Sequence, residues 1–262
     1  MTHGLVRYAV DRGVATIELS HPPANAYSLR MMKDLDEAIL EARFDDAVHV
    51  LLLTGAGSKF FCAGADISML EEVTPRFKYY FCLHANETML RLEQTAKLVI
   101  AALEGHCVGG GLEIALAADL RVAAAGSGKV GLPEVALGVL PGTGGTQRLA
   151  RLVGKSKAIR LMCEGTLLDY HRAAELGLVD HVWDHDGFLE RAHEYARGFC
   201  PPHKASLAVG HIKRAVQTGL EVGLEQGLAL ERELQQRLFE SHDAAEGIAA
   251  FNEKRKPDFT GT

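Results

Sequence analysis

Short apolar runs alternate with segments of helical periodicity through the first half of this 262-residue chain. Two β-prone runs joined by Asp11, Arg12 and Gly13 predict a hairpin, and Ser28 is placed to cap the helix that follows. The expected elements are a hairpin (5–10 with 14–19), a helix (28–43), a buried strand (48–53), a long helix (74–97) and a strand (98–103). Strands separated by helices indicate an α/β protein with a largely parallel core.

The pattern becomes almost entirely helical after Gly144, apart from a strand candidate at Gly177–Trp183. The clearest helical segments are 192–199, 205–216 and 220–239. We therefore expect a core domain over residues 1–200 and a C-terminal helical region over 201–262. Its amphipathic faces would pack on the core or on another subunit.

Composition excludes several classes of protein. With 28 basic and 34 acidic residues the net charge is −6, which argues against nucleic acid or an anionic membrane as a partner. Apolar runs fall short of the ~18 residues of a membrane span, and Met1–Asp11 lacks the basic start and apolar block of a secretory signal. We expect a cytoplasmic protein.

Known cofactor motifs are missing from the sequence. Gly154, Lys155 and Ser156 resemble the end of a phosphate-binding loop, but Leu149 occupies the position of its earlier glycine. Neither G-x-G-x-x-G before a helix, nor G-x-S-x-G, nor H-E-x-x-H occurs. Nucleotide hydrolysis, nicotinamide binding and serine esterase chemistry are therefore not indicated.

The cysteines and paired histidines favour structural explanations. Five cysteines are widely spaced without a Cys-x-x-Cys pair, which predicts reduced thiols in the core. His181 and His185 lie four residues apart among aspartates at the expected end of a strand, where a solvated loop is favoured over a metal site.

Three consecutive glycines, Gly109–Gly111, stand between the apolar run 98–103 and an alanine-rich helical stretch. This order predicts a strand, a tight turn and a helix N-terminus. The N–H groups there, Gly110's among them, lack intrahelical partners and stabilise an anionic oxygen. Glu113, in the first helical turn, would then place an acid/base group beside the oxyanion site.

Two further segments support such a site. Phe61–Asp66 is a second glycine-containing loop after a buried strand, so N–H groups near Ala65 could face the same ligand. Glu134 is a lone acid between Pro133 and an apolar run. It is either a capping or turn carboxylate, or a buried group whose pKa is raised toward the range of proton transfer.

Taken together, residues 21–26, 61–67, 105–119, 132–148 and 251–256 resemble the enoyl-CoA hydratase/isomerase (crotonase) family nearly end to end. The resemblance implies a crotonase-like spiral of repeated ββα units followed by a helical trimerisation region. It also implies a homotrimer, or a homohexamer built as a dimer of trimers.

Site residues follow from the resemblance. The N–H groups of Ala65 and Gly110 match the family's oxyanion hole, and Glu113 and Glu134 match its two catalytic glutamates. The residues expected to contact CoA are Ala24, Ala63, Ala65, Asp66, Ile67, Phe251 and Lys254, the last two from a neighbouring subunit near the phosphates. Ser68 replaces the lysine of many members, which removes one expected phosphate contact. The basic run 251–256 is otherwise explained as a solvated helix end.

The expected activity is hydration of a trans-2-enoyl-CoA in β-oxidation or a related acyl-CoA degradation. No metal or redox cofactor is expected, because CoA belongs to the substrate. An isomerase that moves the double bond is the alternative within the fold, and a non-catalytic scaffold or RNA-binding protein is the alternative outside enzymes. Tyr27, Met69, Leu70 and the 141–144 loop are candidate pocket walls.

Overall fold

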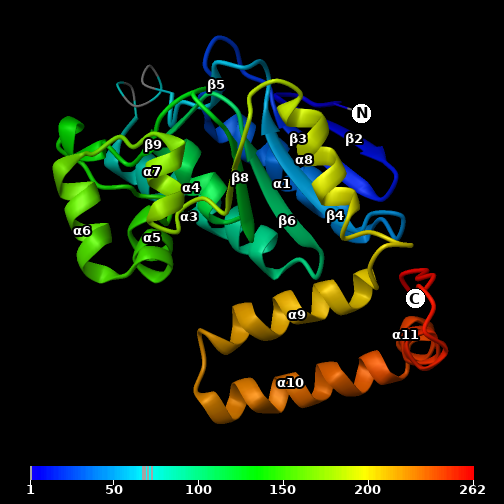
Figure 1. Ribbon diagram of the computed structural model, residues 1–262. Helices are drawn as coiled ribbons and strands as arrows, with labels where there is room; N and C mark the ends of the chain where they lie inside the picture. The colour runs from blue at the N-terminus through cyan, green and yellow to red at the C-terminus, as the bar shows by residue number, and fades with distance from the viewer. Residues whose placement is uncertain (1, 67–68, 70, 72) are drawn as a thin grey trace.

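The computed structural model describes residues 2–66, 69, 71 and 73–262, and these form two sheets surrounded by helices (Figure 1). Strands β1 to β3 of the large sheet pair antiparallel, and from β3 onward all neighbours are parallel. The order in this sheet is β1 (Thr2–His3), β2 (Val6–Asp11), β3 (Val14–Leu19), β4 (Val50–Gly55), β6 (Leu98–Leu103), β8 (Leu120–Ala124) and β10 (His181–Trp183).

A repeated ββα unit generates the second sheet. In each repeat the chain leaves a strand of the large sheet, adds a short parallel strand to the small sheet and enters a helix. The short strands are β5 (Phe60–Cys62), β7 (His106–Val108) and β9 (Val130–Gly131), and the helices are α3 (Pro75–Gln94), α4 (Gly110–Leu116) and α5 (Gly145–Val153). This spiral confirms the predicted α/β fold.

Glycines allow the chain to turn between the two sheets. Gly105 has φ +83°, and a Cβ there would lie 2.2 Å from the carbonyl carbon of Lys59. One on Gly128 would lie 2.3 Å from the carbonyl carbon of Gly105. Because backbone meets backbone at this corner, a side chain at either position would push the small strands apart.

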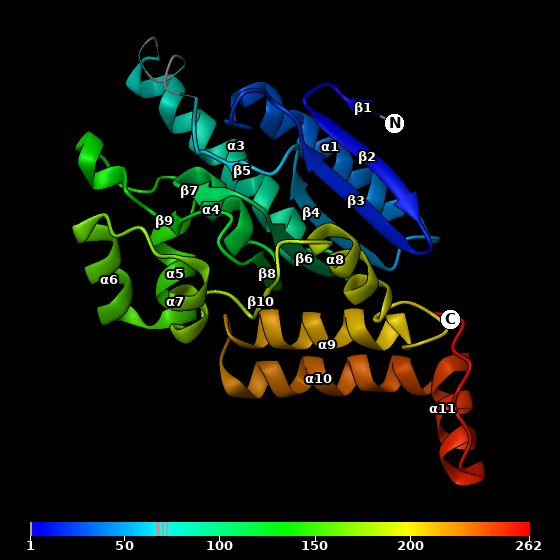
Figure 2. The same cartoon turned by 45° about the horizontal axis from the view of Figure 1, so that its top comes forward.

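Helices lie on both faces of the large sheet, and its central strands are buried on both sides (Figure 2). Leu51 and Leu53 of β4 face the main core with α1 (Leu29–Phe44), α3 and α4, whereas Val50 and Leu52 face α8 (Phe188–Arg197). Continuous apolar strands are typical of parallel sheets covered on both sides. Helix α4 is buried along its whole length, which places its N-terminus inside the molecule.

Some expectations about local structure are confirmed. The hairpin turns through Arg12 and Gly13, both with positive φ, and Ser28 accepts a hydrogen bond from the N–H of Met31 as the cap of α1. Thr74 likewise caps α3, with Pro75 as its first residue.

Other expectations are wrong. The strand directly before the glycine turn is β7, because the 98–103 run belongs to the large sheet and a further strand intervenes. Helix α3 ends at Gln94 instead of Lys97. Strand β8 escaped prediction because it contains Arg121, which is buried with its guanidinium donating to the carbonyls of Ala118 and Leu178.

Cysteine burial differs from the expected core thiols at two positions. All five thiols are free, and Cys62, Cys107 and Cys200 are buried. Cys82 is half-buried, and Cys163 is exposed on α6 (Lys155–Glu164), so the expectation fails for it.

The last helices form an extension below the sheet in Figure 1. Helices α9 (Ser206–Gly219) and α10 (Leu224–Phe239) pack side by side, and α11 (His242–Glu253) follows at their end. Lys213 of α9 is buried, with its Nζ 2.9 Å from Asp119 Oδ2 and donating to the carbonyls of Leu92 and Lys97. The division at residue 200 into two domains stays a prediction.

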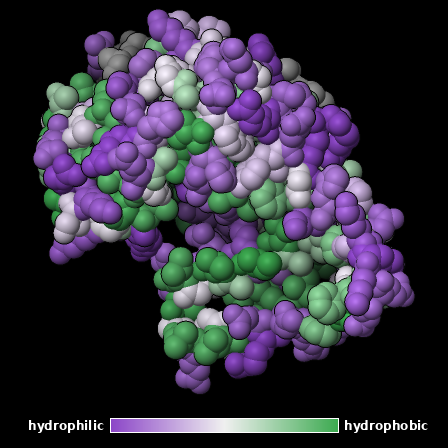
Figure 3. Space-filling view, viewed as in Figure 1, coloured by the Kyte–Doolittle hydropathy of each residue, from purple (hydrophilic) through white to green (hydrophobic). Residues whose placement is uncertain are grey.

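Apolar side chains remain exposed along this extension (Figure 3). They include Ile212, Val216, Leu220 and Leu224, of which the last two are 79% and 78% exposed. Exposed apolar patches of this kind mark surfaces for association.

Candidate active site

The glycine turn forms the first part of the site. Gly109 has φ +55°, and its N–H donates to the carbonyl of Gly131 at 2.9 Å, which ties the turn to β9. Gly110 then begins α4, and its N–H has no acceptor among the described residues. Glu113, one turn along, is 2% exposed.

The loop after β5 supplies the second part. Tyr27 donates its N–H to the carbonyl of Gly64 at 2.9 Å and accepts from the N–H of Asp66 at 3.0 Å. In this parallel bridge the N–H of Ala65 points away from the Tyr27 backbone. A Cβ on Gly64 would lie 3.3 Å from the nitrogen of Gly110, so the two loops are in contact.

These loops bring the two expected oxyanion donors together. Neither the N–H of Ala65 nor that of Gly110 has a partner within the described part of the chain. Backbone donors left unpaired inside a protein need an acceptor, and a ligand oxygen between them would supply it. Their assignment as an oxyanion hole stays a prediction that the geometry permits.

Glu113 is held by the loop that precedes α5. Its Oε1 accepts from the N–H groups of Thr143 and Gly145, both at 2.8 Å, and its Oε2 accepts from the hydroxyl of Thr143. Gly145 is the first residue of α5, so the carboxylate lies at a helix N-terminus, where negative charge is favoured. All three donors are satisfied by an ionised carboxylate in one orientation.

Glu134 has a contrasting environment. It begins a 3₁₀ helix, η1 (Glu134–Leu137), and its carboxyl is hydrogen-bonded to the backbone of its own residue. Its Oε2 is buried without a partner in the described residues, and its Oε1 lies 3.1 Å from the place of a Cβ on Gly109. The Glu134 carboxyl therefore lies against the glycine turn at Gly109.

Burial raises the pKa of Glu134 to about 7. The hydrogen bond to the Glu134 backbone lowers this pKa, the nearby Glu113 carboxylate raises it, and Lys78 lowers it, so burial is the dominant cause. The raised pKa agrees with the second of the two explanations that the sequence left open, and the role of Glu134 in proton transfer stays a prediction.

The expected CoA contacts of the first half lie in adjacent loops. The carbonyl of Ala24 accepts from the N–H of Ala63 at 3.0 Å, which places Ala24 beside the strip that runs through Ala65 to Asp66. The side chain of Asn25 fixes this loop by donating to the carbonyls of Ala56 and Phe60, at 3.0 and 2.8 Å. Ile67, Ser68 and Leu70 lie outside the described residues.

Phe251 and Lys254 are not brought to the site within one chain. Phe251 is 84% exposed on α11, and Lys254 ends that helix with φ +57°. Figures 1 and 2 both place α11 at the far end of the molecule from α4 and β5. A contribution to the site of another subunit is the arrangement compatible with this position.

The sequence did not reveal how Thr143 holds Glu113. Thr143 lies in the Pro141–Gly144 loop, which was expected only as a pocket wall. The one signal in the sequence was the hydroxyl of Thr143 between two glycines, because glycines leave the neighbouring N–H groups accessible to a buried acceptor.

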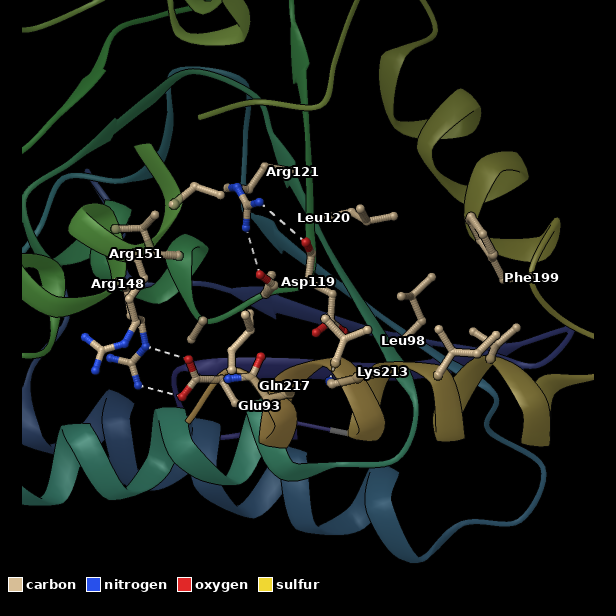
Figure 4. Close-up of a pocket in the computed structure, with 18 of the residues that line it drawn as sticks. Glu93, Leu98, Asp119, Leu120, Arg121, Arg148, Arg151, Phe199, Lys213 and Gln217 are labelled. Atoms are coloured by element: carbon tan, nitrogen blue, oxygen red, sulfur yellow. Dashed lines mark hydrogen bonds and ion pairs between the residues drawn. The ribbon is translucent and has the colours of Figure 1, made fainter. Parts of the chain in front are cut away.

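A cavity of about 670 Å³ lies elsewhere, between α9 and the core (Figure 4). Its walls are largely apolar and include two ion pairs: Arg148 binds Glu93 with two contacts of 2.7 Å, and Lys213 binds Asp119. Neither Glu113 nor Glu134 lines it. The cavity is thus separate from the two carboxylates.

The described residues contain neither a membrane-spanning helix nor a metal-binding cluster. No helix among them is long and apolar enough to cross a membrane. No cluster of three or more His, Cys, Asp or Glu side chains is arranged there to hold a metal ion.

Comparison with known proteins identifies the family. The family model described as enoyl-CoA hydratase/isomerase matches residues 9–262. The chain belongs to the enoyl-CoA hydratase/isomerase family. A short-chain-enoyl-CoA hydratase from Clostridium acetobutylicum is 38% identical over 244 residues, 93% of this chain and 92% of that protein.

Solved structures of family members agree with the fold. The enoyl-CoA hydratase of Geobacillus kaustophilus HTA426 is 45% identical, with a TM-score of 0.96 over 98% of this chain and 97% of that one. The enoyl-CoA hydratase of Bacillus anthracis is 34% identical, with a TM-score of 0.93 over 99% of this chain and 100% of that one. The resemblance inferred from the sequence is thereby confirmed.

Proposed function

We propose that this protein is an enoyl-CoA hydratase, which adds water syn across the 2,3-double bond of a trans-2-enoyl-CoA to give a 3-hydroxyacyl-CoA. The observation that carries the proposal is the pair of carboxyl groups in unlike environments, Glu113 fully bonded and Glu134 with a free oxygen, beside two unpaired backbone donors.

The thioester oxygen would lie between the N–H groups of Ala65 and Gly110. Attack of water at C3 moves negative charge onto this oxygen, giving an enolate. Each donor aimed at such an oxygen is worth about 3 kcal/mol in other oxyanion holes. Gly110 is buried and Ala65 is partly buried, which limits the water that competes for these donors.

The two carboxyl groups fit different steps. Glu113, ionised and fixed by three donors, is suited to orient the water and take its proton. Glu134, with a pKa of about 7, carries a proton in a large fraction of molecules at neutral pH and is suited to deliver one to C2. The bonds formed are C3–O and C2–H, and the proton passed to Glu113 balances the one given by Glu134.

Isomerisation of the double bond is the rival on the same site. It needs one base that removes a proton and returns it, so a second carboxylate with its own set of donors has no role in it. The support given to Glu113 therefore favours hydration.

We further propose an acyl-CoA thioester as substrate, with CoA as part of it and no metal or redox cofactor, since the reaction needs only proton transfers and electrostatic stabilisation. We propose a homotrimer or homohexamer, supported by the exposed apolar side chains of α9 and α10 and by the position of α11, the helix of Phe251, far from α4 in its own chain. Five free cysteines suit a reducing compartment such as the cytoplasm.

The test is the absorbance of the conjugated enoyl thioester. It is expected to fall on adding crotonyl-CoA, and Glu113→Gln and Glu134→Gln should each slow this by about a hundredfold or more while leaving binding of a saturated acyl-CoA intact. Glu175→Gln, at an exposed glutamate on α7 (Tyr170–Glu175), is the control. Near-full activity of either site variant would reject the two-carboxylate mechanism.

Two further assays separate the rivals. A 3-enoyl-CoA that gains conjugation, with no consumption of crotonyl-CoA, would identify an isomerase. Salt-dependent retention of RNA without any change in enoyl absorbance would identify a non-catalytic RNA-binding protein.

A further inference from the structure

Tyr27 contacts three different parts of the candidate site. Its backbone forms the bridge to Ala65 through hydrogen bonds with Gly64 and Asp66. These bonds fix which way the N–H of Ala65 points. The main chain of Tyr27 thus sets the direction of one oxyanion donor.

The ring of Tyr27 packs against Gly110, the residue that carries the second donor. A Cβ on Gly110 would lie 1.8 Å from Tyr27 Cε1, so the ring packs directly on the α-carbon of Gly110. On the other side the ring stacks on Phe81 of α3, with centroids 5.5 Å apart. Since the side chain is only 2% exposed, this packing leaves the start of α4 no room to shift toward Tyr27.

The hydroxyl of Tyr27 reaches the general base through Thr143. It lies 3.3 Å from Thr143 Oγ1, and the Thr143 hydroxyl bonds to Glu113 Oε2. An ionised carboxylate only accepts, so Thr143 donates to Glu113 and its oxygen is left to accept from Tyr27. Burial, with the Glu113 charge adding to it, raises the pKa of Tyr27 well above its usual value, so the phenol keeps the proton it donates.

We propose that Tyr27 and Thr143 are positioning residues for hydration: Tyr27 orients the Glu113 carboxylate through the Thr143 hydroxyl while its backbone and ring fix the donors of Ala65 and Gly110. The inference rests on the proposed hydratase function. One side chain then sets the distance between the base that activates water and the oxygen that takes up the charge, which are the two points the reaction must align.

Steady-state kinetics on crotonyl-CoA test this arrangement. Thr143→Val removes a hydrogen bond to a charged group and is expected to lower kcat about tenfold to a hundredfold with KM within about twofold. Thr143→Ser restores the hydroxyl and should recover most of kcat. Tyr27→Phe keeps the ring and backbone and should lower kcat about threefold to tenfold.

The decisive measurement is the double variant. If Tyr27 acts through Thr143, adding Tyr27→Phe to Thr143→Val causes no further loss of kcat, whereas independent roles multiply the two losses. Tyr170→Phe is the matched control, because Tyr170 is also buried and donates its hydroxyl to a carbonyl, that of Gly105 at 2.6 Å. It should lower the melting temperature without changing kcat.

Each other outcome is informative. Three results would overturn the inference and leave the hydratase function in place. They are kcat losses that multiply in the double variant, a wild-type kcat in Thr143→Val, and a kcat loss in Tyr170→Phe equal to that in Tyr27→Phe. If Thr143→Val does not fold, unchanged kcat in Tyr27→Phe still refutes it. A wild-type protein that does not hydrate crotonyl-CoA or any longer enoyl-CoA removes the proposed function, and the inference with it.

Discussion

Replacing Glu134 by glutamine is expected to stabilise the folded protein at alkaline pH and to leave it unchanged at acid pH. Burial raises the pKa of this carboxyl from 4.5 to about 7, and its Oε2 has no partner in the described residues. Between these two values the folded chain holds a proton that the unfolded chain has released. The free energy of unfolding therefore falls as the pH rises through this window.

The magnitude follows from the shift. One pKa unit corresponds to about 1.4 kcal/mol, so the difference between 4.5 and about 7 sets an upper limit of about 3 kcal/mol on the cost to the wild-type protein above the higher pH, and solvent screening of this partly exposed residue reduces that cost. Glutamine keeps the shape and stays neutral. Glu134→Gln should thus gain up to about 3 kcal/mol at pH ~8.5 and close to nothing at pH ~4.

Urea denaturation at both pH values measures this, followed by the fluorescence of Trp183, the single tryptophan, which packs between Phe188 and Tyr195. Protein concentration is held constant, because association also stabilises the folded state. Glu175→Gln, at an exposed carboxylate, should change the free energy by less than about 1 kcal/mol at either pH. An equal gain at both pH values, or a loss at pH ~8.5, would refute the reasoning.

Three other predictions concern the turn, the extension and the assembly. Gly110→Ala places a Cβ 1.8 Å from Tyr27 Cε1 and should abolish hydration and lower the melting temperature. Gly219→Ala, whose Cβ would meet nothing within 4 Å, should do neither. An active Gly110→Ala enzyme would contradict the packing of Tyr27 on Gly110. Lys213→Met leaves Asp119 buried without its cation and should lower the free energy of unfolding in urea by about 3 kcal/mol, of which adding Asp119→Asn should recover a part. A loss below about 1 kcal/mol would show the ion pair to be unimportant for stability. Lys254→Glu and Glu134→Gln should each have low hydratase activity alone. Unfolding and refolding the two variants together should restore part of the activity, because mixed oligomers contain sites with both native residues. No gain in activity would argue against a site shared between subunits.

Local rules predicted the elements that have caps and turns. Ser28 and Thr74 are visible as helix starts, and a two-residue turn through Gly13 follows from backbone geometry alone. Strands β5, β7 and β9 were not predicted, because two or three residues are too few to show a period. The whole small sheet depends on pairing between distant repeats.

The site was predictable to the extent that each loop carried its own chemistry. The glycine turn predicted backbone donors near Gly110, and the Phe61–Asp66 loop suggested a second set near Ala65, 45 positions earlier in the chain, but only the family resemblance assigned the two N–H groups to one oxyanion hole. Whether Glu134 is buried could not be decided from its neighbours, since the sequence fitted a turn equally well. Its pKa depends on packing that no local pattern encodes.

Glu113 and Glu134 are held by separate parts of the fold, the first by the start of α5 and the second by the η1 turn. Exchanging one carboxyl therefore leaves the support of the other, and the backbone donors, in place. Evolution can therefore replace one acid/base residue without disturbing the other. Single substitutions at these positions give a short route between reactions that share an enolate, and the same two positions are the natural starting points for redesigning this protein.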